Sequence, residues 1–370
     1  MRVAITGAGG FVGKNARVRL REAGVTEQIE LHRDATDAQL LEAVSQADAV
    51  LHLAGVNRPP SEAEFQSGNA GFTERLLRAL EQSGRPLPVI YASSIQAALD
   101  NPYGKSKRAA EEALQRYSET SRASVYLFRL PNVFGKWSRP NYNSAVATFC
   151  HNLARGLPIQ VHDPAAPLRL IYVDDVLSQF LDVLIDPAGP VGVLTPRSVY
   201  ETTVGEVADH LRSFVGSRAS LVSARVGTGL VRALYSTYVS FLPPESFAYP
   251  VPRHTDPRGA FVEMLKTQDS GQFSYFTSHP GVTRGEHYHH SKTEKFLVIR
   301  GKAHFGFRNV DTDERYELVV EGGEGRIVET APGWTHNVTN VGSEELIVML
   351  WANEIFDRER PDTFGMKVSP

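Results

Sequence analysis

The first fifteen residues, MRVAITGAGGFVGKN (residues 1–15), join a short apolar run to three glycines spaced three residues apart. Gly7, Gly10 and Gly13 follow directly on RVAIT, which has the composition of a buried strand. Glycines at this spacing permit a tight turn, a close approach of the backbone to a pyrophosphate and close packing of the next helix. The helix N-terminus behind such a turn offers unpaired N–H groups to phosphates. The stretch therefore predicts the opening strand, turn and helix of a nucleotide-cofactor site.

Strand-like and helix-like segments alternate from residue 1 to about residue 190. Short apolar runs occupy residues 2–6, 49–55, 88–94 and 124–130. Between them lie amphipathic stretches such as residues 69–84, whose leucines share one helical face. Apolar strands that alternate with helices predict a Rossmann-type, doubly wound parallel sheet with helices on both faces.

The pattern of predicted secondary structure changes after Pro243 and Pro244. Residues 190–245 still have the pattern of helices and connections, whereas residues 247–355 form short β-rich runs separated by Gly, Pro, Asp and Asn. Such runs without helical periodicity predict a β-sandwich or barrel. A chain of 370 residues also exceeds one ordinary core. We therefore expect two domains, residues 1–245 and residues 246–370.

Composition limits the class of protein and its partners. The formal net charge is −3, which gives no global electrostatic reason to expect nucleic acid or an anionic membrane surface as a partner. The single cysteine, Cys150, excludes an intramolecular disulfide. No apolar run approaches the roughly 20 residues of a membrane span, and Met1 leads into a strand rather than a signal peptide. We expect a cytoplasmic enzyme.

A second group of polar residues follows one of the apolar runs, in YASSIQAALDNPYGKSK (residues 91–107). Tyr103 and Lys107 are four residues apart, so on a helix they share a face. There the lysine ammonium lowers the pKa of the phenol and binds the nicotinamide ribose, while the phenol passes a proton to or from a substrate oxygen. The hydroxyl of Ser94, at the end of the preceding strand, orients that oxygen. This set predicts proton transfer beside a nicotinamide cofactor.

The residues after the expected second strand bear on the choice of cofactor. NAD sites place an acid about 20 residues beyond the glycine turn, where it binds the ribose 2′-hydroxyl. Here IELHRDAT puts His32 and Arg33 at that point, and a guanidinium suits the 2′-phosphate of NADPH. Asp34 lies close to the same point, and the alternative is that Arg33 is only a solvated loop residue. We expect NADPH.

These residues, together with HLAG (52–55), RLPNVFG (129–135) and YVDDV (172–176), resemble the extended short-chain dehydrogenase/reductases that act on nucleotide sugars. The resemblance spans residues 1–240 and implies a catalytic set of Ser94, Tyr103 and Lys107. It implies substrate contacts at Asn132, Arg139 and Asn141. It also implies cofactor contacts at Gly7, Gly10, Phe11, Val12, Gly13, His32, Arg33, Leu53, Ala54, Gly55, Tyr103 and Lys107.

One departure from that family bears on the reaction. The 4,6-dehydratases place an Asp-Glu pair after the active-site Ser or Thr, whereas Ile95 and Gln96 follow Ser94 here. Dehydration therefore lacks its acid and base, and simple carbonyl reduction with a replaceable NADPH fits better. A 4-epimerase, which usually keeps NAD bound, is the alternative.

The C-terminal half contains GVTRGEHYHHSKTEKFLVIRG (residues 281–301), which places three histidines within four residues ahead of an apolar run. On a strand, His287 and His289 point to one face, and Glu294 can join them from the next strand. His336 follows downstream. Three imidazoles and one carboxylate suit zinc, iron, nickel or manganese, and an open coordination position can polarise a substrate carbonyl. The spacing predicts a divalent-metal site.

This spacing resembles both cupin motifs, although Ala331 holds the usual proline position of the second and Pro332 directly precedes Gly333. The resemblance implies an all-β cupin barrel with the metal ligands His287, His289, Glu294 and His336. TRGEHYHH also resembles the R-G-x-H-Y stretch of metal-free cupin epimerases that act on nucleotide-linked 4-keto-6-deoxy sugars. In those enzymes the histidine is a general base, so His287 is a base rather than a ligand in the competing interpretation.

The two halves in this order resemble the bacterial reductase–cupin enzymes of UDP-N-acetyl-L-fucosamine synthesis, which serve capsular polysaccharide and O-antigen. The resemblance runs nearly end to end and implies that the cupin epimerises carbon 3 of a UDP-2-acetamido-4-keto-6-deoxy hexose. It implies that NADPH then reduces carbon 4 to give UDP-2-acetamido-2,6-dideoxy-L-talose, with zinc in the cupin and a homodimer or larger homo-oligomer. The alternatives are a UDP-sugar 4-reductase or 4-epimerase with a structural cupin, and a sensor that binds cofactor and metal without turnover.

Overall fold

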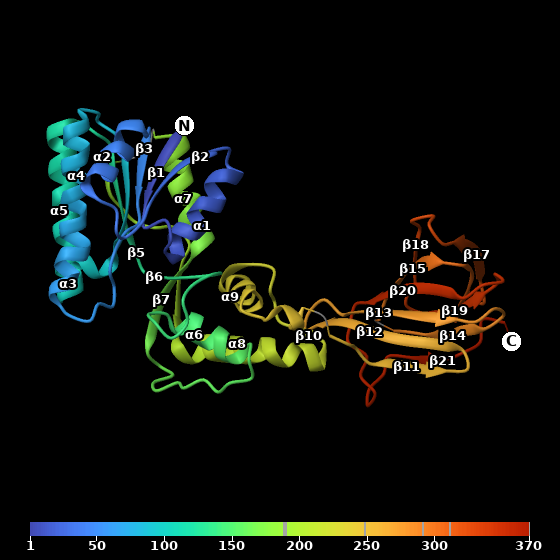
Figure 1. Cartoon of the computed structure of the whole chain (residues 1–370). Helices are drawn as coiled ribbons and strands as arrows, with labels where there is room; N and C mark the ends of the chain where they lie inside the picture. Colours follow the sequence, from blue (N-terminus) through green and yellow to red (C-terminus); the bar gives the residue numbers. More distant parts are fainter. Residues whose placement is uncertain (188–190, 248, 291, 311, 370) are drawn as a thin grey trace. The chain divides into compact units, whose positions relative to one another are not determined.

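The computed structural model describes residues 1–187, 191–247, 249–290, 292–310 and 312–369 (Figure 1). The chain divides into two compact units. The first unit combines Met1–Arg212 with Arg232–Pro243, and the second combines Ser213–Val231 with Pro244–Pro370. Among the described residues, none of the helices combines the length and the apolar character that crossing a membrane requires.

The first unit is built on a six-stranded parallel sheet with the strand order β2-β1-β3-β4-β5-β8. Its central strands are apolar on both faces, and Val3, Ala4 and Ile5 have no exposed surface. The predicted Rossmann-type parallel sheet is therefore confirmed. The strands are β1 (Arg2–Thr6), β2 (Glu27–Leu31), β3 (Ala49–His52), β4 (Val89–Ser94), β5 (Val125–Leu130) and β8 (Gly192–Leu194).

Helices cover both faces of this sheet. Figure 1 shows α2, α4 and α5 over one face and α1 and α7 over the other. The bounds are α1 (Phe11–Glu22), α2 (Asp37–Gln46), α4 (Phe72–Ser83), α5 (Pro102–Ser121) and α7 (Val173–Ile185). In α4 the predicted apolar face is buried, with Leu76, Leu77 and Leu80 against the sheet core. The helix ends at Gly84, whose φ of 64° is the left-handed conformation that glycine adopts most easily.

Helix α5 begins with two residues that favour a helix N-terminus, Asn101 and Pro102. The side chain of Asn101 accepts a hydrogen bond of 2.7 Å from the Gly104 N–H, and Pro102 occupies the first helical position. Both features are typical of a helix N-terminus. This start places Tyr103 and Lys107 in the first two turns of the helix, next to the carboxyl end of β4.

A second, three-stranded sheet with the order β6-β7-β9 lies beyond β5 in the chain. Its strands are β6 (Asn132–Phe134), β7 (Pro167–Tyr172) and β9 (Val199–Thr203). The longer helices of this region are α6 (Ala145–Leu153), α8 (Val204–Ser220) and α9 (Gly229–Ser240). Short elements are α3 (Ala63–Phe65), η1 (Gln66–Gly71), η2 (Ile95–Ala98), β10 (Val222–Ser223) and η3 (Pro244–Ser246).

The second unit is dominated by two β-sheets, which agrees with the predicted all-β fold. One sheet has the order β10-β12-β13-β20-β15-β18, with β11 added beside β12, and the other has the order β17-β16-β19-β14-β21. Phe296 and Val298 of the first sheet form one core with Phe305 and Phe307 of the second. The strands are β11 (Arg253–Asp256), β12 (Gly259–Thr267), β13 (Gln272–Ser278), β14 (Thr283–Tyr288), β15 (Glu294–Arg300), β16 (Lys302–Asn309), β17 (Arg315–Glu321), β18 (Ile327–Glu329), β19 (Trp334–Asn340), β20 (Leu346–Ala352) and β21 (Phe364–Gly365).

Candidate active sites

The three glycines of the opening stretch form the turn between β1 and α1. A Cβ atom on Gly13 would lie 2.3 Å from the carbonyl oxygen of Gly7, and one on Gly7 would lie 2.8 Å from the backbone nitrogen of Ala54. Neither position therefore accepts a larger residue. The first turn of α1 has no side-chain cap at Gly10, so its N–H groups are left for a ligand. This geometry fits a pyrophosphate bound at a helix N-terminus.

A pocket of about 820 Å³ opens over this turn and over the carboxyl ends of β4 and β5. Its volume lies within the usual range for small-molecule and cofactor sites, about 300–1,000 Å³. Twelve of the residues expected to bind or react line it: Gly7, Gly10, Phe11, Val12, Gly13, Leu53, Gly55, Ser94, Tyr103, Lys107, Asn132 and Arg139. Four others are not in its lining, namely His32, Arg33, Ala54 and Asn141.

Ser94, Tyr103 and Lys107 converge in this pocket. Ser94 ends β4 and hydrogen-bonds the phenol of Tyr103. The Lys107 ammonium donates to the Ala92 carbonyl oxygen at 2.9 Å and lies 4.5 Å from the centre of the Tyr91 ring. The pocket therefore has a hydroxyl pair for a substrate oxygen and a cation beside it.

The pKa values of this group differ from the expectation that Lys107 lowers the pKa of Tyr103. Burial raises the pKa of the Tyr103 phenol, and the hydrogen bond with Ser94 opposes only part of that rise. Burial also lowers the pKa of Lys107 to about 7, against the attraction of Glu111. A phenol that keeps its proton at neutral pH is suited to act as an acid toward an oxygen that gains negative charge.

Glu111 is a residue of this site that the sequence pattern did not reveal. Its carboxylate is buried, accepts a hydrogen bond of 2.5 Å from Ser93 Oγ and forms a two-pronged ion pair with Arg129. Glu111 follows Lys107 by four residues on α5, so the i, i+4 spacing was the available signal. The carboxylate ties α5 to the ends of β4 and β5, where the reacting groups stand.

The two residues expected at the adenosine end lie just after β2. A Cβ atom on Gly9 would lie 3.3 Å from His32 Nδ1, so the His32 ring flanks the glycine turn. The Arg33 side chain is 82% exposed, with one nitrogen 3.9 Å from the carboxylate of Glu64. The nearest acid within β2, Glu30, is 2.7 Å from Arg17. Arg33 is therefore exposed and only loosely paired, whereas Glu30 has a close cationic partner.

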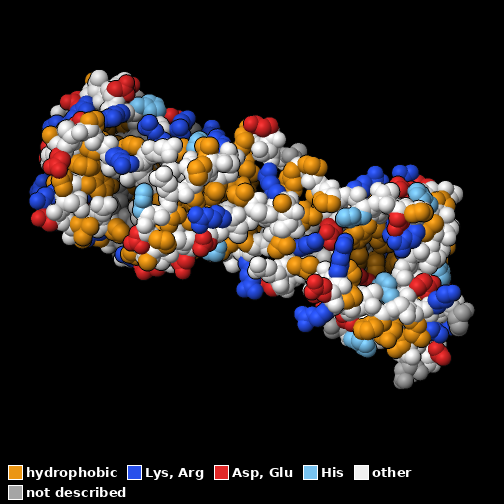
Figure 2. Space-filling view, turned by 90° about the horizontal axis from the view of Figure 1, so that it is seen from below, with side chains coloured by type: hydrophobic (Ala, Val, Ile, Leu, Met, Phe, Trp, Pro, Cys, Tyr) orange, Lys and Arg blue, Asp and Glu red, His pale blue; other side chains and the backbone are white. Residues whose placement is uncertain are grey.

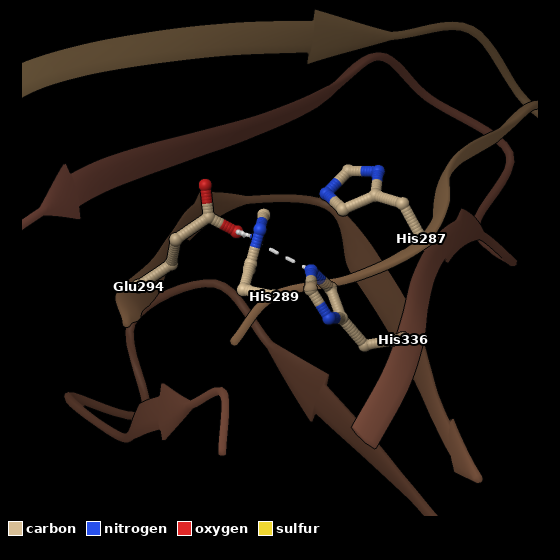
Figure 3. A group of neighbouring side chains, drawn as sticks. All are labelled: His287, His289, Glu294 and His336. Carbon is tan, nitrogen blue, oxygen red and sulfur yellow. Dashed lines mark hydrogen bonds and ion pairs between the residues drawn. The ribbon is translucent and has the colours of Figure 1, made fainter. Parts of the chain in front are cut away.

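In the second unit, the four predicted metal ligands come together from three strands (Figure 3). Their ligand atoms all lie within 4.8 Å of one another. His287 belongs to β14 and pairs directly with His336 of β19, His289 follows the end of β14, and Glu294 begins β15. A bulge between Gly285 and His287 interrupts the ladder, with Glu286 at a φ of 61°. This bulge sets the side on which the histidines project.

The donor set of this group fits a divalent cation. His336 Nε2 is buried without a hydrogen-bond partner, although it lies 3.3 Å from a Glu294 oxygen. Burial alone would raise the pKa of the Glu294 carboxyl, but His289, His336 and the nearby charge of Lys292 hold it well below its usual range. Burial, followed by the charge of His336, lowers the pKa of His287 to about 4. An ionised Glu294 carboxylate and a neutral His287 imidazole are the protonation states in which these two residues bind metals.

Lys292 is a second residue that the sequence pattern did not reveal. It is 7% exposed, and its ammonium lies 3.2 Å from the second oxygen of Glu294. No local pattern in the sequence distinguishes this lysine from the other polar residues between the two strands. Three other ionisable neighbours of the histidines differ in burial: His290 is exposed, whereas Glu286 and Lys295 are partly exposed.

Basic and acidic side chains are interspersed on the face of the molecule seen in Figure 2. Among the described residues on that face, Lys and Arg therefore form no extended basic surface of the kind that binds nucleic acid. This agrees with the small net charge of the chain.

Known proteins resemble the chain over its whole length. Residues 3–191 match the NAD dependent epimerase/dehydratase family, and residues 254–364 match the polysaccharide biosynthesis C-terminal domain. A Pseudomonas aeruginosa protein named UDP-2-acetamido-2,6-beta-L-arabino-hexul-4-ose reductase is 56% identical over 368 residues, which cover 100% of this chain and 99% of that protein.

Solved structures extend the comparison to the fold. The capsular polysaccharide assembling protein CapF from Staphylococcus aureus has a TM-score of 0.91 and 42% identity, covering 99% of this chain and 100% of that one. RMD from Pseudomonas aeruginosa, complexed with NADPH, has a TM-score of 0.54 and 23% identity, covering 65% of this chain and 99% of that one. The second likeness shows the fold of the first unit alone.

Proposed function

This chain belongs to the NAD dependent epimerase/dehydratase family, and we propose that it is a bifunctional nucleotide-sugar enzyme of the cytoplasm. Its second unit, a cupin barrel, epimerises carbon 3 of a UDP-2-acetamido-4-keto-6-deoxy hexose. Its first unit then reduces the 4-ketone with NADPH to UDP-2-acetamido-2,6-dideoxy-L-talose, a step toward UDP-N-acetyl-L-fucosamine for capsule or O-antigen. The observation that carries the proposal is that each unit holds its own reactive group, Ser94, Tyr103 and Lys107 in one and the histidine cluster in the other.

The reductase chemistry follows from the pocket of the first unit. Bound NADPH would supply the hydride. Ser94 and Tyr103 both offer hydroxyl groups to the ketone oxygen, and Tyr103 passes its proton to that oxygen as negative charge develops there. Lys107 holds the nicotinamide ribose, and Asn132 and Arg139 of the same lining contact the UDP-sugar. Asn141, outside the lining, is assigned to the substrate on the resemblance alone.

The epimerase chemistry uses the acidity of carbon 3 beside the ketone. His287, His289, Glu294 and His336 would hold a divalent cation, for which we propose zinc. The cation would supply Lewis-acid polarisation of the ketone oxygen. The orphaned nitrogen of His336 and the convergence of four ligand atoms within 4.8 Å support four ligands over the alternative in which His287 is a metal-free general base.

The proposal is tested by proton NMR of the 4-keto substrate with the enzyme in D2O. Without NADPH, we expect deuterium to enter carbon 3 while the ketone remains. Addition of NADPH should then remove the ketone. Reduction without exchange at carbon 3 would favour the second candidate, a UDP-sugar 4-reductase with a structural cupin. If neither reaction occurs, the result would favour a sensor without turnover.

The choice of NADPH predicts a selective effect at Arg33. Replacing Arg33 by alanine should raise the KM for NADPH by about 10- to 100-fold, because a charged hydrogen bond to the 2′-phosphate is lost. The KM for NADH should change little. Arg212→Ala on α8 is the control, since its side chain is 51% exposed and, like that of Arg33, pairs with an acid. An equal rise of the KM for both cofactors would show that Arg33 does not bind the 2′-phosphate.

We also infer a homodimer formed through the outer face of the larger sheet of the second unit. Tyr275, Met349, Leu297 and Ile327 stand in register across β13, β20, β15 and β18. They alternate with the core residues of the same strands, so they lie on the opposite face. Met349 is 36% and Ile327 52% exposed, and an apolar row of this kind is typical of protein–protein contacts.

Replacing Met349 by glutamate should weaken dimerisation by about tenfold or more, because the contact would have to desolvate a charge. Sedimentation velocity over a concentration series measures the change. Val319→Glu on β17, also exposed but in the other sheet, should leave the dimer intact. Dissociation by Val319→Glu and not by Met349→Glu would move the interface to the smaller sheet.

A further inference from the structure

The last described residues of the chain run along the strand that carries the proposed metal ligands. Strand β21 pairs with β14 in antiparallel register, His287 opposite Gly365 and Tyr288 opposite Phe364. Figure 1 shows β21 beside β14 within the second unit. The C-terminal segment, residues 362–368, thus adds an edge strand to the sheet at the level of a ligand.

Asp362, the first residue of this segment, forms hydrogen bonds with the loop that follows β14. Its main-chain carbonyl accepts a hydrogen bond from His289 Nδ1. Its carboxylate accepts from the N–H of His290 at 2.9 Å and from the N–H of Lys292 at 2.8 Å. A proton held on Nδ1 by that carbonyl leaves His289 Nε2, which lies 3.3 Å from Glu294, as the nitrogen that faces the cluster.

The far end of the segment is fixed by separate contacts. Glu286, the residue of the bulge, accepts the Met366 N–H through its carbonyl oxygen and the Val368 N–H through its carboxylate at 2.7 Å. Arg308 donates to the Lys367 carbonyl at 2.8 Å, and Val368 is 3% exposed. The segment is therefore held at both ends, with His287 and His289 between the two anchors.

We propose that residues 362–368 form a strap that belongs to the metal centre: it fixes the tautomer and direction of His289 and holds the loop that leads to Glu294. The inference rests on the proposed metal site and deepens it. Partners that orient a ligand in this way typically govern metal affinity by about 10- to 100-fold, because without them the imidazole must be ordered when the ion binds. The strap acts through His289 and the loop, and is therefore a positioning element.

The test measures zinc affinity of the full chain by competition with a chromophoric chelator. Asp362→Ala removes both carboxylate bonds to the loop and keeps the carbonyl bond to His289, so we expect zinc to bind about tenfold more weakly. Asp362→Asn keeps one good acceptor and should lie between Asp362→Ala and the wild type. A chain that ends at Pro361 loses all the contacts and should bind at least about 100-fold more weakly.

Asp357→Ala is the matched control, because this exposed aspartate lies in the same terminal region and pairs with Glu359 and Arg360, which lie outside the strap. Far-UV circular dichroism, which reports on the β-sheets of the second unit, checks that this unit is folded in each variant. Unchanged zinc affinity in Asp362→Ala and in the shortened chain would overturn the strap alone. A wild-type chain that binds no zinc would overturn the metal site and the strap with it.

Discussion

Replacing Tyr103 by phenylalanine should lower the rate of NADPH-dependent ketone reduction by about 10²- to 10⁴-fold, the usual contribution of a positioned general acid. The substitution removes only the phenolic oxygen. The ring that packs 5.6 Å from Phe65 is retained, and so is the rest of the pocket. NADPH affinity should therefore stay close to that of the wild type, and the loss should lie in the chemical step.

Single-turnover loss of NADPH absorbance measures that step. Tyr117→Phe is the matched control, because Tyr117 lies on the same helix and directs its hydroxyl to the Arg85 carbonyl oxygen, away from the pocket. Deuterium exchange at carbon 3 of the substrate should persist in both variants, since the second unit performs it. Reduction at an undiminished rate in Tyr103→Phe would assign the proton to another donor.

The first unit was largely predictable because its signals are local. The glycine turn, the apolar strands and the Tyr103–Lys107 spacing each lie within a few residues, and the fold brings Ser94, Tyr103 and Lys107 into one pocket. The metal cluster was predictable for the same reason, since three of its members fall between His287 and Glu294.

The remaining features depend on contacts that no local pattern encodes. The carbonyl of Asp362 accepts a hydrogen bond from His289, which lies 73 residues away in the sequence. The carboxylate of Glu111 accepts one from Ser93, 18 residues away. The pKa shifts of Tyr103 and Lys107 follow from burial, which is a property of the folded pocket. Sequence spacing predicted that Ser94, Tyr103 and Lys107 lie together, as they do in the pocket, but it could not show how deeply their side chains are buried.

Replacing His289 by alanine should lower deuterium exchange at carbon 3 by about 10³-fold and abolish tight zinc binding. Lewis-acid stabilisation of the developing enolate amounts to several kcal/mol, and each 1.36 kcal/mol corresponds to about tenfold in rate. The first unit should still reduce a 4-ketone supplied with carbon 3 already inverted. His304→Ala, in the same unit but 3.3 Å from the exposed Glu317, is the control.

The same experiment on His287→Ala decides between the two roles of that histidine. If His287 is a ligand, the variant should lose zinc and exchange together, as His289→Ala does, because both rings contribute to one cluster. If His287 is a general base, exchange should disappear from a chain that still binds zinc, or from one in which zinc is absent throughout. Metal content and exchange rate measured on the same samples therefore separate the metal-dependent reaction from the metal-free one, and loss of zinc with exchange intact would contradict both.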